Sequence, residues 1–220
     1  ADGTVREYSN GQGLEWFFES EGMLGILTRV SLEVRRLPEA TAHHLLYFGE
    51  IKDLFDFLSP LVNTAPYPYA VEILDDNYLS LLKAFGYEVT DFGSGGGILL
   101  VTYEGGQEEI EAGGDVIKRL APSYHGEARE GAEEEWQHRF NMLRVRKAVP
   151  TVIPSSVHVP IAGLNQFYSG LRKLKKRPIG LLGYVVANSE CMLMPMVVSD
   201  EKKVTEYTFA LHVPRELSNL

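Results

Sequence analysis

The chain has 220 residues, of which 45% are hydrophobic and 23% charged, and its formal net charge is −9. This length and composition predict a globular protein of one domain, or one domain and part of another, with a sizeable core. The acidic balance argues against a nucleic-acid-binding protein, because phosphate contacts need clustered Lys and Arg. No apolar run reaches the roughly 18 residues that a membrane-spanning helix needs.

Cys191 is the single cysteine of the chain. One cysteine cannot form an internal disulfide or a cysteine-based zinc cluster, which is typical of proteins from a reducing compartment. No signal peptide opens the chain, so we expect a cytoplasmic protein. Because the sequence begins with Ala1 rather than Met, we also expect it to be a cut or engineered piece of a longer polypeptide.

The first predicted element is a strand over residues 26–34. Every second residue is suited to a buried face: Ile26, Thr28, Val30, Leu32 and Val34. This alternation is typical of a half-buried strand, which Pro38 would end. Gly22 and Gly25 precede it, and glycines there allow either a tight turn or a close approach of another group to the backbone. Periodicity alone favours the turn.

After Thr41 the pattern alternates between strands and helices. Strands are predicted over residues 43–49, 69–75, 97–105 and 156–161, and as a hairpin over 180–199 that turns at Asn188 and Ser189. Helices are predicted over residues 50–62, 77–85, 107–120, 132–147, 164–174 and 201–214. Asn77 is the expected N-cap of the second helix, and the apolar run 97–105 is expected in the centre of the sheet. This rhythm predicts an α+β fold of the split βαβ kind, with helices mainly on one face.

Two stretches resemble phosphate-binding or nucleic-acid-binding features. The glycine-rich segment 93–97 precedes a strand instead of opening a helix, so an interstrand loop is favoured over a phosphate cradle. The basic cluster 172–177 lies at the end of a predicted helix. Cations are favourable at a helix C-terminus, so a solvated helix end is favoured over a binding patch.

The histidines show no metal-binding spacing. The sequence holds His43, His44, His125, His138, His158 and His212. None forms the i, i+4 pair with an intervening Glu that a zinc protease needs. His43 and His44 should point to opposite faces of a strand. Structural roles are favoured and no metal is predicted, although a site formed through space stays open.

Arg139 is the most informative charged residue. On the predicted helix 132–147 it shares a face with Trp136 and Leu143, so it should point toward the protein. Its planar guanidinium suits a carboxylate ligand. A salt bridge to one of the many glutamates is the alternative.

Several segments together resemble one family. The stretch "ESEGMLGILTRVSLEVRRLPE" (residues 19–39) resembles the strand that closes the FAD-binding domain of FAD-linked oxidases. These belong to the vanillyl-alcohol-oxidase superfamily, and the resemblance is to the branch of D-lactate dehydrogenases and the glycolate oxidase flavoprotein subunit. "PYPYAVEILDDNYLSLL" (66–82), "ILLVTYEGGQEEIEA" (98–112) and "EEWQHR" (134–139) resemble cap-domain segments of that family in the same order.

The resemblance implies a domain organisation and a cofactor. Residues 1–40 would be the C-terminal part of an FAD-binding domain, and residues 41–220 most of the cap, or substrate, domain. The cap would be an antiparallel sheet of ferredoxin-like units. Backbone groups of the turn before the first strand would contact FAD: Ser20, Glu21, Gly22, Gly25 and Ile26. The glycine-rich pyrophosphate loop of the family has no counterpart in this sequence.

The resemblance also implies a reaction. A small 2-hydroxy acid, of the glycolate or D-lactate type, would be oxidised by hydride transfer to flavin, and Arg139 would bind its carboxylate. A homodimer or partner oxidase subunits would be expected, because a partial flavin domain leaves apolar surface exposed.

The sequence departs from the family pattern at several positions. Glu19 and Met23 replace a glycine and a threonine of the first motif. In "GYVVANSEC" (183–191), Tyr184 and Ala187 stand where the 2-hydroxy-acid enzymes carry a histidine and an aspartate. Tyr184 is therefore the candidate for the catalytic base by position only. These losses favour an alternative function, a non-catalytic cap-fold binding module or a subunit of a larger oxidase.

Overall fold

The structure, a computed structural model, divides into two compact units, residues 1–37 and 38–220. It describes residues 3–18, 20, 22–84, 86–87, 94–139, 151–174 and 179–217.

The N-terminal unit has little regular structure. It contains one 3-10 helix, η1 (Leu14–Phe17), beside which the rings of Tyr8 and Phe17 lie 4.6 Å apart. The strand predicted over residues 26–34 is wrong for this structure, which shows extended chain without strand pairing. Ile26 is 92% exposed and Val34 84% exposed. Alternation identifies a face that can be buried, but a strand also needs a partner edge, and the described part of residues 1–37 provides none.

The second unit is built on an eight-stranded sheet in the order β4-β1-β3-β2-β7-β8-β5, with β6 also paired to β8. The strands are β1 (Ala40–Phe48), β2 (Ala70–Asp75), β3 (Gly97–Gly105), β4 (Gly126–Arg129), β5 (Thr151–Pro154), β6 (Val157–Pro160), β7 (Ile179–Ala187) and β8 (Glu190–Ser199). Every described pair of strands is antiparallel. The predicted α+β class with an antiparallel sheet is confirmed.

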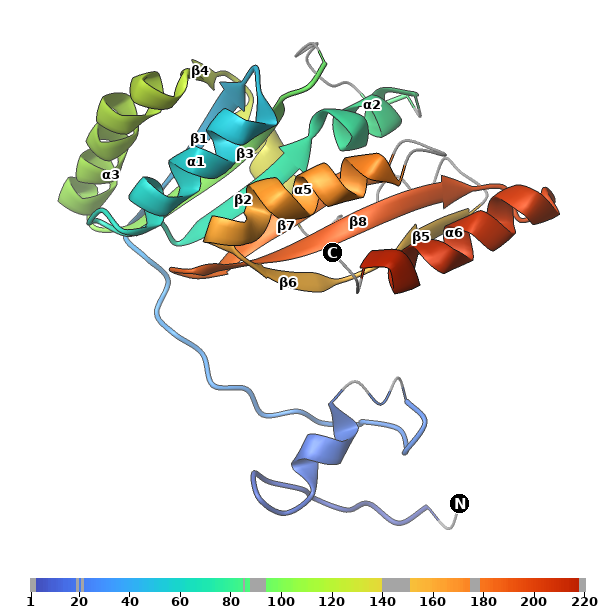
Figure 1. Ribbon diagram of the computed structural model, residues 1–220. Helices are drawn as coiled ribbons and strands as arrows, with labels where there is room; N and C mark the ends of the chain where they lie inside the picture. Colours follow the sequence, from blue (N-terminus) through green and yellow to red (C-terminus); the bar gives the residue numbers. More distant parts are fainter. Residues whose placement is uncertain are drawn as a thin grey trace. The chain divides into compact units, whose positions relative to one another are not determined.

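The helices divide unequally between the two faces of the sheet. They are α1 (Ile51–Val62), α2 (Asp76–Ala84), α3 (Gln107–Leu120), α4 (Ala132–Gln137), α5 (Leu164–Lys173) and α6 (Val204–Leu217). Helices α1, α3, α5 and α6 cover one face (Figure 1), which we call the helix-covered face. Its core includes Phe48, Ile73, Leu99 and Leu181. Helices α2 and α4 pack on the other face, the second face, which presents Leu45, Leu74, Leu100 and Leu182. The prediction of helices mainly on one face is confirmed.

The connectivity shows a repeated pattern. The segment β1-α1-β2-α2-β3-α3-β4 forms a four-stranded part of the sheet in the order β4-β1-β3-β2. The segment β6-α5-β7-β8-α6 places β8 between β7 and β6, which corresponds to the first three strands of the same pattern. The fold therefore consists of two related split βαβ units side by side, although the sequence shows no repeat at a fixed period.

Most predicted elements match the structure within a few residues. Strand β3 pairs on both sides, with β1 and β2, and is interior as predicted. Short strands β4 and β5 were not predicted. The predicted helix 132–147 ends at Gln137, and its part from residue 140 lies outside the described residues. Helix α6 continues through Pro214 to Leu217, beyond the predicted end.

The loop before β3 connects structural elements, as expected for an interstrand loop. The Ile51 N–H donates to the Gly95 carbonyl at 3.0 Å, and the Gly95 N–H donates to Asp76 Oδ2 at 2.8 Å. A Cβ at Gly96 would lie 1.9 Å from the Phe48 carbonyl oxygen, so only glycine fits there. Gly93 lies outside the described residues.

Asp75 joins elements from both sides of the sheet. Its Oδ1 accepts hydrogen bonds from the N–H groups of Tyr78 in α2 and Leu181 in β7, both at 2.8 Å. Its Oδ2 accepts from the Tyr168 hydroxyl of α5 at 3.1 Å. Complete burial raises the pKa of Asp75 to about 7, against the opposing effect of the backbone donors. The prediction that Asn77 caps α2 is wrong, because Asp75 accepts the amide of the first turn and Asn77 Nδ2 donates to the Ile179 carbonyl.

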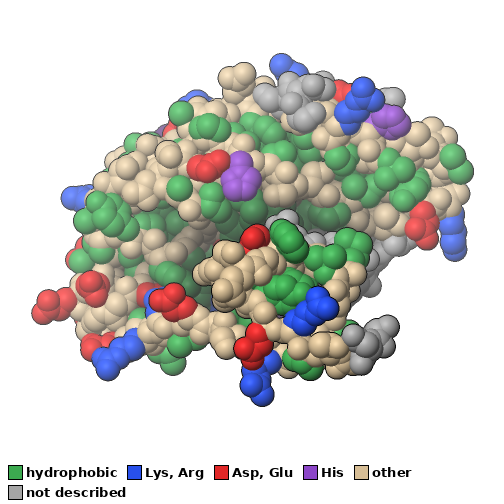
Figure 2. Space-filling view, turned by 90° about the horizontal axis from the view of Figure 1, so that it is seen from below, with side chains coloured by type: hydrophobic (Ala, Val, Ile, Leu, Met, Phe, Trp, Pro, Cys, Tyr) green, Lys and Arg blue, Asp and Glu red, His purple; other side chains and the backbone are tan. Residues whose placement is uncertain are grey.

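None of the described helices has the length and apolarity to cross a bilayer. On the face that Figure 2 shows, apolar side chains are interspersed with polar groups. The basic cluster begins in the last turn of α5 with Arg172, whose Nη2 lies 3.1 Å from Asp76 Oδ1. This ion pair supports the structural interpretation of that arginine, whereas residues 175–177 lie outside the described residues.

Candidate functional site

Polar side chains interrupt the apolar second face on four neighbouring strands. His43 on β1 pairs directly with Thr102 on β3, and Glu72 on β2 pairs directly with Tyr184 on β7. Thr102 is 0% exposed and Glu72 is 7% exposed. Buried polar groups are costly unless they are hydrogen-bonded, so such positions indicate specific pairing.

His43 is the centre of the first polar group. Its Nδ1 lies 2.9 Å from Thr102 Oγ1, and its Nε2 lies 3.5 Å from Glu133 Oε2 in α4. The imidazole stacks on the Trp136 indole with ring centroids 4.6 Å apart and planes inclined by 26°. The sheet thus fixes the imidazole on one side, and the imidazole contacts α4 on the other.

Arg139 extends this group beyond the end of α4. Its Nη1 donates to the Trp136 carbonyl oxygen at 2.9 Å, and its Cζ lies 4.1 Å from the centroid of the Trp136 ring. A guanidinium over an indole is attracted by the ring quadrupole. The predicted proximity of Trp136 and Arg139 is confirmed, whereas Leu143 of the predicted stripe lies outside the described residues.

The electrostatics of the group favour a neutral His43. Burial lowers the pKa of His43 below its ordinary value of 6.5, and the positive charge of Arg139 lowers it further. The carboxylates of Glu133 and Glu104 act in the opposite direction. At neutral pH the cationic group of this cluster is therefore Arg139, not the imidazole.

Tyr184 belongs to the second polar group. Its hydroxyl donates to Glu72 Oε1 at 3.3 Å across the β2–β7 pair. Tyr184 was predicted as a candidate base from its position only, and Glu72 was not predicted at all. The available signal was a carboxylate between the apolar residues Val71 and Ile73 of a predicted strand.

The remaining histidines are distributed over the unit. His44 points to the helix-covered face, with its ring 6.1 Å from that of Tyr103, so the prediction of opposite faces for His43 and His44 is confirmed. His125 pairs with Asp53 at 2.9 Å and His158 with Glu190 at 3.2 Å, both on the surface. Within the described ranges, no three His, Cys, Asp or Glu residues are placed to hold a metal ion.

The proposed flavin contacts lie in a turn of the N-terminal unit. The Met23 N–H donates to the Ser20 carbonyl at 2.8 Å. Gly22 has a φ of 80°, and no atom lies within 4 Å of the position of a Cβ there or at Gly25. The tight turn is confirmed, and its glycine backbone is open to approach by a ligand. Glu21 lies outside the described residues.

A protein-family comparison identifies the chain. The family described as "FAD linked oxidases, C-terminal domain" matches residues 37–208. The chain belongs to this family. The family uses FAD, and the part of an FAD-linked oxidase that this match covers is the cap domain. A search of curated protein sequences found no match.

Three solved enzyme structures share the fold. An alkyldihydroxyacetonephosphate synthase superimposes with a TM-score of 0.66 and 15% identity over 90% of this chain and 43% of that chain. A p-cresol methylhydroxylase with substrate bound superimposes with a TM-score of 0.57 and 17% identity, over 82% of this chain and 43% of that chain. A 4-ethylphenol oxidase from Gulosibacter chungangensis superimposes with a TM-score of 0.60 and 15% identity, over 82% of this chain and 43% of that chain. This chain spans less than half the length of these proteins, and identities this low establish the fold alone.

Proposed function

We propose that this chain is part of an FAD-dependent oxidoreductase that oxidises a small 2-hydroxy acid of the glycolate or D-lactate type. The observation that carries the proposal is Arg139, a guanidinium placed on Trp136 at the second face of the cap sheet. A planar guanidinium can bind a carboxylate through two parallel hydrogen bonds. Arg139 would fix the acid end of the substrate and thereby orient its α-carbon.

The N-terminal unit would provide part of the cofactor site. In this proposal residues 1–40 are the C-terminal part of an FAD-binding domain and residues 41–220 the cap domain. The open glycine backbone of the turn supports contacts from Ser20, Gly22, Gly25 and Ile26 to the FAD pyrophosphate and adenosine. Glu21 would complete the set. When bound, FAD would supply the hydride acceptor.

Tyr184 would receive the hydroxyl proton of the substrate. As that proton moves to the Tyr184 oxygen, the proton of Tyr184 would move along its hydrogen bond to Glu72 Oε1. In this oxidation the C–H electron pair and hydrogen of the α-carbon would leave together as hydride to the acceptor, and the C–OH group would become a carbonyl. The hydroxyl proton would be replaced, through Tyr184, by one proton gained at Glu72. A general base must lie within hydrogen-bond reach of the proton it accepts, so the proposal requires the substrate hydroxyl to lie beside the Tyr184 hydroxyl.

The test is the visible absorbance spectrum of the purified chain after incubation with FAD and desalting. We expect retained flavin bands, which decrease on anaerobic addition of D-lactate or glycolate and persist with lactamide, which has no carboxylate. Retained flavin that neither acid reduces would contradict the proposed reaction. A protein without flavin bands would contradict the proposed cofactor contacts of the turn.

A non-catalytic role is the second candidate. Tyr184 and Ala187, at positions where 2-hydroxy-acid enzymes of the family carry a histidine and an aspartate, support a cap-fold binding module or a subunit of a larger oxidase. Such a module would bind carboxylates without reducing flavin. The proposal further includes association as a homodimer or with partner oxidase subunits, and a cytoplasmic location.

A further inference from the structure

His43 contacts both the rigid sheet and the aromatic ring that carries Arg139. Its side chain is 9% exposed. Thr102, which lies 2.9 Å from His43 Nδ1, sits on an interior strand that pairs on both sides. A side chain fixed in this way has one available orientation, because a change of rotamer would leave the Thr102 hydroxyl buried without this contact.

The position of Trp136 is held less firmly by its own helix than that of His43 is by the sheet. Helix α4 spans only Ala132–Gln137, and helices this short have little stability without tertiary contacts. The stacking of His43 on the indole, 4.6 Å between centroids, is therefore a main contact between α4 and the sheet. Loss of the imidazole would free the indole to change its orientation.

Arg139 makes two contacts with Trp136 that hold its guanidinium. Its guanidinium lies over the indole ring and donates to the Trp136 carbonyl. Both contacts move with Trp136. From this series of contacts, Thr102 to His43 to Trp136 to Arg139, we infer that His43 is a positioning residue that sets the orientation of the Arg139 guanidinium for a carboxylate ligand.

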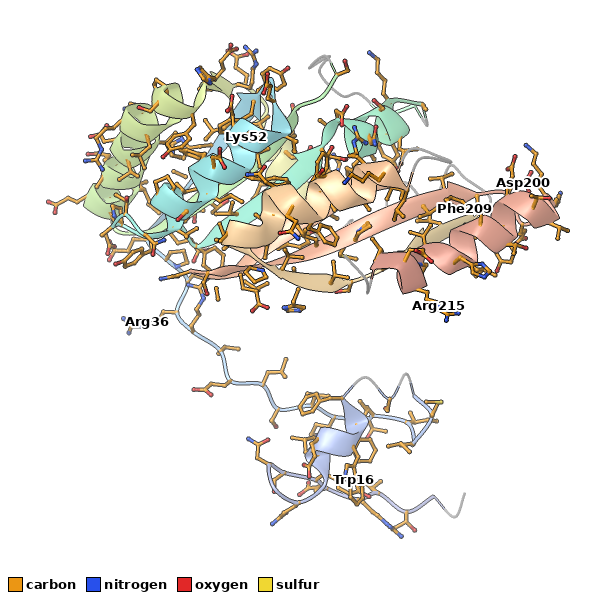
Figure 3. The ribbon with its side chains drawn as sticks, viewed as in Figure 1. Trp16, Arg36, Lys52, Asp200, Phe209 and Arg215 are labelled. Carbon is orange, nitrogen blue, oxygen red and sulfur yellow. The ribbon has the colours of Figure 1, made fainter. Side chains whose placement is uncertain are left out.

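This inference rests on the proposed function for the identity of the ligand, but its structural part can be tested without any ligand. A protonated imidazole quenches the fluorescence of a stacked indole. The chain contains two tryptophans, and Trp16 is 69% exposed on η1 in the N-terminal unit (Figure 3). The variant Trp16→Phe therefore leaves Trp136 as the single tryptophan of the chain.

The first experiment follows Trp136 emission against pH in the Trp16→Phe chain. We expect a titration with its midpoint below 6.5, because the pKa of His43 is lowered. Glu104 and Glu133 raise the pKa of His43, and Arg139 lowers it. On the opposite face, the charge of His43 lowers the pKa of His44. Arg139→Gln should raise the midpoint, because it removes a positive charge. His43→Ala should abolish the titration, whereas His44→Ala should keep it.

The second experiment titrates the same proteins with D-lactate at pH 7.5 and follows Trp136 emission, with lactamide as the ligand that lacks a carboxylate. His43→Ala should weaken D-lactate binding about fivefold, the size expected for the loss of an aromatic stack. His43→Phe retains a ring for stacking and should recover most of the affinity. His44→Ala changes the adjacent residue of the same strand and should leave affinity unchanged.

The outcomes separate the two claims. If the parent chain shows the pH titration and its Arg139 dependence but no response to D-lactate, the carboxylate role of Arg139 fails while the coupling of His43 to Arg139 stands. If His43→Ala binds D-lactate like His44→Ala, the positioning role is overturned. An Arg139→Gln midpoint equal to that of the parent would also overturn it, whatever the ligand result.

Discussion

The two faces of the sheet use the same strands for different purposes. On the helix-covered face, alternate strand residues are apolar and pack against long helices, as Phe48 does against Phe57 at 5.3 Å between rings. On the second face, the intervening positions include His43, Thr102 and Glu72, each at low exposure and each hydrogen-bonded. The difference teaches that apolar packing and buried polar pairing can be assigned to alternate residues of one strand. It also predicts that substitutions on the two faces have different consequences.

Phe57→Ala should give the largest loss of stability. Phe57 is 0% exposed in α1, and a Phe-to-Ala change in a core costs about 3–5 kcal/mol through lost burial and a new cavity. Urea denaturation would measure the free energy of unfolding. Trp136→Ala on the second face is the control, and we expect a smaller loss because Trp136 is half-buried. An equal loss for both variants would remove the distinction between the faces.

Asp75→Ala should come next, because Asp75 connects the two faces. The change leaves the buried N–H groups of Tyr78 and Leu181 without their acceptor. Unsatisfied buried groups of this kind cost about 1–3 kcal/mol each, so we expect a total loss of about 3 kcal/mol. Asp75→Asn keeps an acceptor oxygen and should lose less than about 1 kcal/mol. Identical denaturation curves for the two variants would show that the hydrogen bonds do not matter.

The same residue predicts a pH dependence. The pKa of Asp75 is raised from 3.8 to about 7 in the folded protein, so the native state keeps a proton that the unfolded state releases. Its contribution to stability is therefore complete below pH 3.8 and is lost as the pH rises toward about 7. His43 and His44, whose pKa values are lowered, act in the opposite direction. The measurement is the difference in unfolding free energy between the parent and Asp75→Asn, which should decrease across this window. A constant difference would contradict the raised pKa.

Arg139→Gln should affect the ligand more than the fold. A hydrogen bond to a charged group contributes about 2 kcal/mol, so the KM for D-lactate in flavin reduction should rise about 30-fold. The unfolding midpoint should stay near that of the parent. Arg129→Gln is a matched control, because Arg129 is also an arginine over an aromatic ring, 5.2 Å from Tyr47, but on the edge strand β4. Equal effects on KM would argue against a specific carboxylate site.

Tyr184→Phe should have the smallest effect on stability, less than about 1 kcal/mol, because its hydrogen bond to Glu72 is long at 3.3 Å. If Tyr184 receives the substrate proton, the rate of flavin reduction at saturating D-lactate should fall while KM changes little. Unchanged rates of flavin reduction in stopped-flow absorbance measurements would mean that a group other than Tyr184 accepts the substrate proton.

Much of the fold could be predicted because its signals are local. The continuous apolar run of β3 indicates an interior strand, and the 3.6-residue stripe of α1 indicates a helix against a core. The exact caps could not be predicted in the same way. Asp75 and Asn77 are both good cap residues, and only the packing of α5 and β7 around Asp75 distinguishes them.

The errors and omissions concern partners that are distant in sequence. Alternation over residues 26–34 identifies a face but not the strand beside it. The short polar strand β4 carries too few apolar residues to be recognised, and only its pairing with β1 defines it. The His43–Thr102–Trp136 group joins three segments through the β1–β3 register, which no local pattern specifies. Glu72 was detectable as a carboxylate between two apolar strand residues, but its partner Tyr184 lies 112 residues away.

Hydrogen–deuterium exchange of the chain with and without D-lactate would test most directly whether the second face binds the substrate. We predict slower exchange in peptides from α4 and β1 when D-lactate is present, and unchanged exchange in α1 and α5 on the helix-covered face. Lactamide should leave all of these peptides unchanged. Protection confined to α1 and α5, or protection in α4 and β1 that persists in Arg139→Gln, would contradict the assignment of the substrate site to the second face.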